Sequence, residues 1–289
     1  MKNKSLILII GESTGLECLK NLINFRIFNM FLVVSVDPNY HYIVRKICND
    51  NQINFKTSSQ FKKNFDRIKF LKDDNYFLLS IFSNLIIKNC FLKKFNGRAY
   101  NLHPGLLPFY PGKNCVSGVL YNNEKVTGVS LHLIKEKIDT GGIIEIKKIK
   151  ILKKDNLLSL MYKLRLSGIK IINSFLKKIY LEKKLHLKKN KISLRKKFPQ
   201  KIPYDGLINS KIEHIELNNL IRASYFGPFK NTWGKLFFFY EKKKIYIVSI
   251  LNHLKVPKKK FSKLSFIEKV NDNKFNLKIE KKIVQVLTK

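Results

Sequence analysis

Cysteines and long apolar runs are what this sequence has little of. Its four cysteines lie too far apart for a C-x-x-C metal or redox motif: Cys18, Cys48, Cys90 and Cys115. No apolar run approaches the roughly 18 residues of a membrane span. The sequence therefore predicts no metal site, no disulfide framework and no membrane insertion. It is typical of a protein of a reducing compartment, and we expect a cytoplasmic protein.

A glycine-rich nucleotide motif is also missing. The loop after the first apolar run has only Gly11 and Gly15, without the G-x-G-x-x-G spacing of a dinucleotide site. A tight turn between a strand and a helix explains these glycines better than NAD binding does. The opening, 1–14, has the basic start of a signal peptide, but its apolar run is short, so we interpret it as a first buried strand.

Acidic residues are scarce, since 57 Lys and Arg face 20 Asp and Glu and the net charge is +37. Dense positive charge suits a polyanion such as RNA, DNA or an acidic membrane surface. However, lysine is scattered through every segment, and arginine, which is better suited to bidentate phosphate contacts, is scarce by comparison. We therefore favour a compositional bias, and charge alone does not name a partner.

The first part of the chain contains short apolar runs separated by segments with helical spacing. The runs are 5–10, 30–36, 53–56, 76–82 and 99–103, and the helical segments are 15–23 and 84–95. Buried strands that alternate with helices predict an α/β fold with a mostly parallel, doubly wound sheet and helices on both faces. Ligands of such sheets bind beyond the carboxyl ends of the strands.

The pattern changes after residue 125. Residues 125–151 predict an antiparallel hairpin at the edge of the sheet, with its turn at 139–142. Asp155 is then expected to cap a long amphipathic helix over 156–184.

A polar, basic stretch, 185–200, is the predicted linker between a first domain, 1–184, and a small C-terminal β domain, 201–289. A barrel or an open sheet is expected for the second domain. Its predicted elements are a helix at 213–223 and strands at 234–240, 244–251, 275–280 and 282–287.

Rigid residues crowd the loop 101–112, NLHPGLLPFYPG, which holds three prolines and two glycines. Asn101 and His103 are two residues apart on the strand that ends there, so their side chains point to the same side. Asp139, in the hairpin turn, can come within reach of the imidazole. An amide donor, a His acid or base and a carboxylate that orients it are suited to acyl transfer. Taken singly, each has a structural explanation, and the nearby Cys115 is interpreted as structural.

Together with their spacing, these residues resemble a specific family. The loop 101–112 and the stretch VTGVSLHLIKEKIDTGGII, 126–144, are similar to two linked signatures of the 10-formyltetrahydrofolate-dependent formyltransferases. The family includes methionyl-tRNA formyltransferase, glycinamide ribonucleotide formyltransferase and the sugar N-formyltransferases. The resemblance implies a Rossmann-like catalytic domain over 1–184, with 10-formyltetrahydrofolate as the formyl donor. It also implies catalytic roles for Asn101, His103 and Asp139.

The resemblance further implies where the pterin of the donor binds, namely at the strand end 78–84 and at the loop 139–142. The implied cofactor-binding residues are Leu79, Ser80, Phe82, Ile138, Thr140 and Gly141. Asn101 and a protonated His103 would stabilise the oxyanion, and Asp139 would favour the charged imidazole and position a water molecule.

The acceptor amine stays open between members of the family. Pro111 stands where the tRNA enzyme usually has an arginine, and this variation favours a nucleotide-linked amino sugar, for surface polysaccharide. Methionyl-tRNA is the alternative, because a C-terminal β domain and high positive charge suit tRNA. Less favoured are glycinamide ribonucleotide, whose enzyme is typically one domain, and a catalytically silent RNA-binding module.

Six residues are predicted to contact the acceptor: Tyr110, Lys113, Asn114, Arg222, Tyr225 and Trp233. In the second domain the aromatic rings could stack on a nucleotide and the arginine could pair with a phosphate. The other interpretation, which the usual burial of these residue types favours, is core packing for the aromatics and a solvated end for the arginine. A homodimer is one option for the assembly.

Overall fold

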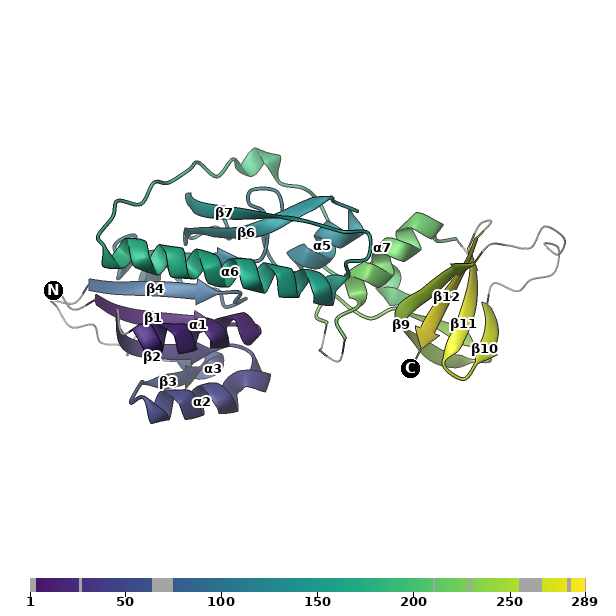
Figure 1. Ribbon diagram of the computed structural model, residues 1–289, viewed down its shortest axis with the longest axis horizontal. Helices are drawn as coiled ribbons and strands as arrows, with labels where there is room; N and C mark the ends of the chain where they lie inside the picture. Colours follow the sequence, from purple (N-terminus) through teal and green to yellow (C-terminus); the bar gives the residue numbers. More distant parts are fainter. Residues whose placement is uncertain are drawn as a thin grey trace. The chain divides into compact units, whose positions relative to one another are not determined.

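The computed structural model describes residues 4–25, 28–63, 75–209, 211–227, 229, 231–254, 267–279 and 282–288. The chain forms two compact units, whose elements are labelled in Figure 1. The first unit comprises Met1–Gly112, Gly128–Ile149 and Lys163–Lys196, and the second comprises Lys113–Thr127, Lys150–Tyr162 and Lys197–Lys289. The predicted domain boundaries at 184 and 201 stay predictions, and the outer ends of those domains, 1–3 and 289, lie outside the described residues.

A seven-stranded sheet is the centre of the first unit. Its strands, in the order β3-β2-β1-β4-β5-β6-β7, are β3 (Phe55–Thr57), β2 (Asn29–Ser35), β1 (Lys4–Ile10), β4 (Asn75–Ile81), β5 (Ala99–His103), β6 (Val126–Leu133) and β7 (Ile143–Lys150). The pairs from β3 to β5 are parallel, and β6 pairs antiparallel with β5. The predicted mostly parallel sheet is therefore confirmed.

Helices pack on both faces of this sheet. On one face, Phe61 of α3 (Ser58–Lys63) and Phe91 of α4 (Asn89–Lys93) join the core cluster with Ile9, and their rings meet edge to face at 5.4 Å. The opposite face meets α1 (Glu12–Phe25), where Gly15 lies so close to Ile10 that a Cβ would not fit. Successive side chains of a strand point to opposite faces of the sheet, so Ile9 and Ile10 of β1 lie on different faces.

The predicted helix over 84–95 is wrong in its first half, because α4 begins only at Asn89. Leu85 and Ile87 are buried, while Ile86 between them is exposed, which is the alternation of an extended chain. The apolar residues there face the core with a period of two, and in so short a run this period is hard to distinguish from helical spacing. A helix that the sequence analysis did not predict, α2 (His41–Asp50), follows β2.

The hairpin and the long helix follow the prediction. Leu133 N donates to the Gly142 carbonyl at 2.9 Å, and β7 is the last strand of the sheet, next to β6. Helix α6 covers Leu157–Tyr180. Its cap is one residue later than predicted: Asn156 Oδ1 accepts from Ser159 N, while Ser159 Oγ accepts from Asn156 N, both at 3.0 Å. Asp155 accepts from Leu152 N at 2.7 Å and from Ser159 Oγ at 3.2 Å.

The second unit contains an antiparallel sheet in the order β10-β11-β12-β9-β8. The strands are β8 (Phe237–Tyr240), β9 (Lys243–Leu254), β10 (Ile267–Asn271), β11 (Lys274–Ile279) and β12 (Lys282–Thr288). This confirms the predicted small β domain, although residue 280 of the predicted strand 275–280 lies outside the described residues.

Two helices belong to the second unit as well, α5 (Cys115–Tyr121) and α7 (His214–Ser224). They are joined by a hydrogen bond from Ser117 Oγ to the Ala223 carbonyl, at 2.9 Å. Among the helices of the described ranges, none is long and apolar enough to cross a bilayer.

Candidate active site

Strand β5 ends in two polar side chains that point to the same side, Asn101 and His103. Both lie at the carboxyl end of the parallel part of the sheet, where α/β proteins bind their ligands. His103 is only 4 % exposed, and its Nε2 lies 2.7 Å from the Tyr110 carbonyl oxygen. A carbonyl only accepts, so Nε2 carries a proton and donates to it.

The loop after β5 fixes this imidazole. A Cβ on Gly105 would lie 2.5 Å from His103 Nε2 and 2.6 Å from the Tyr110 carbonyl oxygen, so only glycine leaves room here. Ser130 of β6 holds the same loop, because its Oγ donates to the Gly105 carbonyl at 2.8 Å and accepts from Leu107 N at 3.0 Å. The rigid loop therefore positions the ring.

Asp139 meets His103 from the turn between β6 and β7. Its Oδ2 is 3.4 Å from His103 Nδ1 and accepts from Gly112 N at 2.7 Å. Its Oδ1 is 3.3 Å from His132 Nε2. The carboxylate is 8 % exposed, and its residue has a φ of +50°. The structure thus brings Asn101, His103 and Asp139 into one buried cluster.

His132 is the functional candidate that the sequence analysis missed. It is 2 % exposed, its Nδ1 lies 2.7 Å from the Leu133 carbonyl oxygen, and its Nε2 lies 3.1 Å from Asn101 Nδ2. His132 is paired directly with Asn101 in the register of β5 and β6. The available signal was the alternation of Ser130 and His132 on a strand that had been predicted to lie at the edge of the sheet.

The charge on Asp139 depends on these neighbours. Burial by itself raises the pKa of the carboxyl group, but the charge of His103, the contact with His132 and the Gly112 N–H together lower it below its ordinary value. The carboxyl group therefore stays ionised at neutral pH, which allows it to hold a proton on His103 Nδ1.

Asn101 has one end of its carboxamide to spare. Its Nδ2 faces His132, and its Oδ1 is buried without a hydrogen-bond partner in the part of the chain that the structure describes. Exchanging the two ends would give the Oδ1 to a protonated His132 Nε2 and leave Nδ2 as the free donor. Either arrangement leaves a buried polar atom available to a bound molecule.

The predicted cofactor-binding residues lie at two places in the first unit. Leu79 and Ser80 are buried on β4, where Ser80 is paired with Asn101, and Phe82 follows with a φ of +46°. The others belong to the Asp139 turn: Ile138 is 53 % exposed, Thr140 Oγ1 donates to the Lys137 carbonyl, and Gly141 packs against the Leu133 carbonyl.

The predicted acceptor-binding residues are divided between the units. Tyr110 is buried in the first unit, where its carbonyl accepts from His103, and Lys113 is exposed in the second. Asn114 is bonded at both ends of its carboxamide, since Oδ1 accepts from Thr232 Oγ1 and Nδ2 donates to the Gln200 carbonyl.

The remaining three lie around α7 and the loop after it. Arg222 Nε donates to the Asp155 carbonyl at 2.7 Å, and Tyr225 is half-buried at the end of the helix. Trp233 is 2 % exposed, and its Nε1 donates to the Pro199 carbonyl at 2.8 Å. The polar atoms of Arg222 and Trp233 thus bond to main chain of their own unit.

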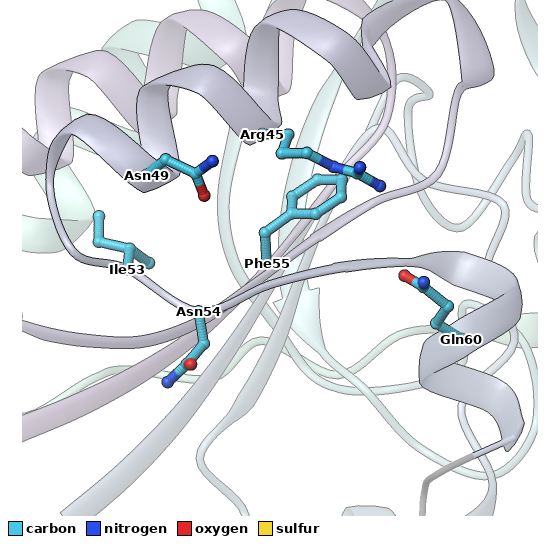
Figure 2. Close-up of a pocket in the computed structure, with 6 residues that line it drawn as sticks. All are labelled: Arg45, Asn49, Ile53, Asn54, Phe55 and Gln60. Carbon is cyan, nitrogen blue, oxygen red and sulfur yellow. The ribbon is translucent and has the colours of Figure 1, made fainter.

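A surface hollow lies elsewhere in the first unit, between α2 and β3. Figure 2 shows its lining, in which the Arg45 guanidinium lies 5.2 Å from the centre of the Phe55 ring. Its other lining residues are Asn49, Ile53, Asn54 and Gln60. None of the predicted site residues lines this hollow, so we place the chemistry at the Asp139 cluster.

Comparison with known proteins indicates the family to which this part of the chain is similar. Residues 33–176 match the family model described as formyl transferase. The chain is 32% identical, over 215 residues, to the bifunctional polymyxin resistance protein ArnA of Wigglesworthia glossinidia brevipalpis. The aligned residues cover 72% of this chain and 32% of ArnA. It is 28% identical, over 152 residues, to GDP-perosamine N-formyltransferase of Brucella melitensis biotype 1, and the aligned residues cover 53% of this chain and 58% of that protein.

A solved structure shares the fold. The sugar 3N-formyl transferase WlaRD, solved with dTDP and 5-N-formyl-THF, is 22% identical with a TM-score of 0.72, covering 100% of this chain and 98% of that one. The chain spans 32% of the length of the first of the two curated relatives and 58% of the second. The matched residues, 33–176, contain Asn101, His103, His132 and Asp139, and this part of the chain belongs to the formyl transferase family.

Proposed function

We propose that this protein transfers a formyl group from 10-formyltetrahydrofolate to the primary amine of a nucleotide-linked amino sugar. The observation that carries the proposal is the buried carboxylate of Asp139 between the rings of His103 and His132, beside Asn101. We expect the reaction to take place in the cytoplasm.

The arrangement suits acyl transfer because its donors are in place before the reaction. The amine nitrogen attacks the formyl carbon, and the carbonyl oxygen gains negative charge. Asn101 can donate to that oxygen through Nδ2 when the two ends of its carboxamide are exchanged, and a protonated His103 can stabilise it through its positive charge. When the bond between the formyl carbon and N10 of the folate breaks, N10 takes a proton that the amine has lost. Asp139 holds the charged imidazole and can position a water molecule that relays that proton from the amine to N10.

We further propose where the two substrates bind. The folate is assigned to Leu79 and Ser80 on β4, to Phe82 directly after it, and to the Asp139 turn with Ile138, Thr140 and Gly141. Both segments adjoin the Asp139 cluster, β4 through its register with β5 and the turn through sequence. The acceptor is assigned to Tyr110, Lys113, Asn114, Arg222, Tyr225 and Trp233.

Lys113 offers a test of the acceptor site. Its side chain is exposed and carries a positive charge that suits a nucleotide phosphate. Lys113→Ala is expected to raise the KM for the acceptor while leaving kcat and the KM for the folate within about threefold. An unchanged KM for the acceptor would remove Lys113 from the proposed site.

The identity of the acceptor is supported by the relatives. GDP-perosamine N-formyltransferase is named for a nucleotide-linked sugar, and WlaRD was solved with a nucleotide and a formylated folate. Methionyl-tRNA is the second candidate, which the net charge of +37 favours. A homodimer stays a proposal, which sedimentation of the purified protein would test.

The test is release of tetrahydrofolate by purified protein. Nucleotide-linked 3-amino and 4-amino sugars and methionyl-tRNA are offered in parallel with 10-formyltetrahydrofolate, and His103→Ala serves as the inactive control. Turnover with a sugar supports the proposal. Turnover with tRNA alone replaces the acceptor, and turnover with none of them refutes the proposal for these substrates.

A further inference from the structure

The segment 186–196 lies within the stretch that the sequence predicted as a linker, but it contacts the catalytic turn. Ile143 and Lys188 form an antiparallel bridge, with N–H to carbonyl bonds of 2.9 and 2.7 Å in the two directions. At its other end, Lys196 N donates to the Phe109 carbonyl at 2.8 Å, in the loop that positions His103. The segment is therefore attached to both catalytic loops of the first unit.

Two side chains of this segment hold the main chain around Asp139. Asn190 Nδ2 donates to the carbonyls of Asp139 and Gly141, at 3.0 and 3.1 Å. Arg195 Nη2 donates to the carbonyls of Ile138 and Asp139, at 3.0 and 3.2 Å. The Asp139 carbonyl accepts from both donors, which uses both of its lone pairs. Asn190 is 8 % exposed, so its hydrogen bonds compete little with water.

Asp139 needs such support because of its backbone conformation. A φ of +50° lies in the left-handed region, which costs a residue other than glycine about 1–3 kcal/mol and persists only when neighbours impose it. That conformation directs the carboxylate toward His103, His132 and the Gly112 N–H. Four hydrogen bonds from the segment 186–196 supply the constraint, and they reach three carbonyls of the turn, those of Ile138, Asp139 and Gly141.

We propose that Asn190 and Arg195 are positioning residues that hold Asp139 in its left-handed conformation and thereby place its carboxylate between the two catalytic-site imidazoles. The kinetic test of this inference rests on the proposed formyl transfer. Its structural test rests only on the geometry of the Asp139 turn. Neither residue is assigned a contact with either substrate.

The kinetic test compares Asn190→Ala with Asn122→Ala. Asn122 is the matched control, because its Nδ2 also donates to a main-chain carbonyl, that of Lys197, at 3.1 Å, but away from the turn. Asn190→Ala is expected to lower kcat by about 10- to 100-fold, as a misplacement near 1 Å does, with the KM for the folate within about threefold. Asn190→Gln, which keeps the amide donor, should recover part of the loss. Asn122→Ala should retain its kcat.

A second variant guards against a simple folding defect. Arg195→Lys keeps one donor group and should lose less kcat than Arg195→Ala at equal melting temperature. The proposal is overturned if Asn190→Ala and Arg195→Ala both fold and keep the wild-type kcat, or if their kcat falls no further than that of Asn122→Ala.

A readout that needs no activity separates this proposal from the proposed function. Carboxyl NMR titration follows Asp139 in the wild type and in Asn190→Ala, with His103 and His132 as the titratable groups that face it. A displaced carboxyl group loses the contacts that lower its pKa, so its titration should move to higher pH in Asn190→Ala. If the wild type formylates no acceptor, the proposed function fails. An Asp139 titration that is the same in both proteins contradicts the positioning role.

Discussion

Gly105→Ala is expected to displace the imidazole of His103. The added Cβ would lie 2.5 Å from His103 Nε2, whereas ordinary contact begins at 3.4 Å, so the ring or the loop must move by the difference, roughly 0.9 Å. The Tyr110 carbonyl is at 2.6 Å from the same Cβ and cannot yield without losing its 2.7 Å hydrogen bond to the ring. The glycine has no left-handed φ, so crowding is the only cost of the substitution.

A displacement of the His103 ring by that distance should have a large effect on kcat and a moderate effect on the free energy of unfolding. Displacing a catalytic group by about 1 Å can lower kcat by about 100-fold, whereas overpacking a core costs about 1–3 kcal/mol. Gly97→Ala is the matched control: its Cβ meets nothing within 4 Å, but its φ of +80° makes the alanine unfavourable by about 1–2 kcal/mol. The control variant is therefore expected to lose stability although its added Cβ does not contact the active site.

The assay is tetrahydrofolate release at saturating substrates, together with thermal unfolding of both variants. Gly105→Ala should lose kcat by one to two orders of magnitude, roughly as the displacement implies, while Gly97→Ala keeps it. A folded Gly105→Ala protein with wild-type kcat would refute the claim that the loop positions His103 for the reaction.

Two further predictions concern the neighbours of His103. His132→Gln removes the ring nitrogen 3.3 Å from Asp139 Oδ1 and should lower kcat by at least about tenfold with little change in either KM, whereas an unaffected kcat would make His132 a packing residue. Asp139→Asn should lower the free energy of unfolding near pH 7, because the pKa of the native carboxyl group is held below its ordinary 3.8. That stabilisation is present above pH 3.8 and is lost on acidification below it. Urea unfolding should therefore show that the difference in the free energy of unfolding between wild type and Asp139→Asn becomes smaller below pH 3.8. A difference that does not depend on pH would contradict the stabilisation of the ionised carboxyl group by its neighbours.

Much of this site could be predicted from the sequence because its signals are local. Asn101 and His103 follow from the two-residue period of a strand that ends in a proline-rich loop, and Asp139 from a turn before another strand. The parallel sheet followed from apolar runs that are buried on both faces. These features depend on neighbours in the chain, which a sequence displays.

Other features depend on distant pairing, which a single sequence does not display. His132 lies in the site because β6 is antiparallel to β5 in a register that pairs it with Asn101. Asn190 and Arg195 lie in a polar stretch with the composition of a linker, and only the fold places them behind Asp139. The burial of Trp233, by contrast, agrees with the core packing that its residue type favours.

The most direct test of formyl transfer at the Asp139 cluster is to follow the formyl carbon itself. Purified protein is incubated with 10-formyltetrahydrofolate that carries an isotopic label in the formyl group and with a nucleotide-linked amino sugar, and the sugar is analysed by mass spectrometry. We predict that the label is found on the sugar nitrogen with wild-type protein and is absent with His103→Ala. Label transfer that is equal in the two proteins, or a sugar that stays unlabelled while tetrahydrofolate is released, would contradict the account.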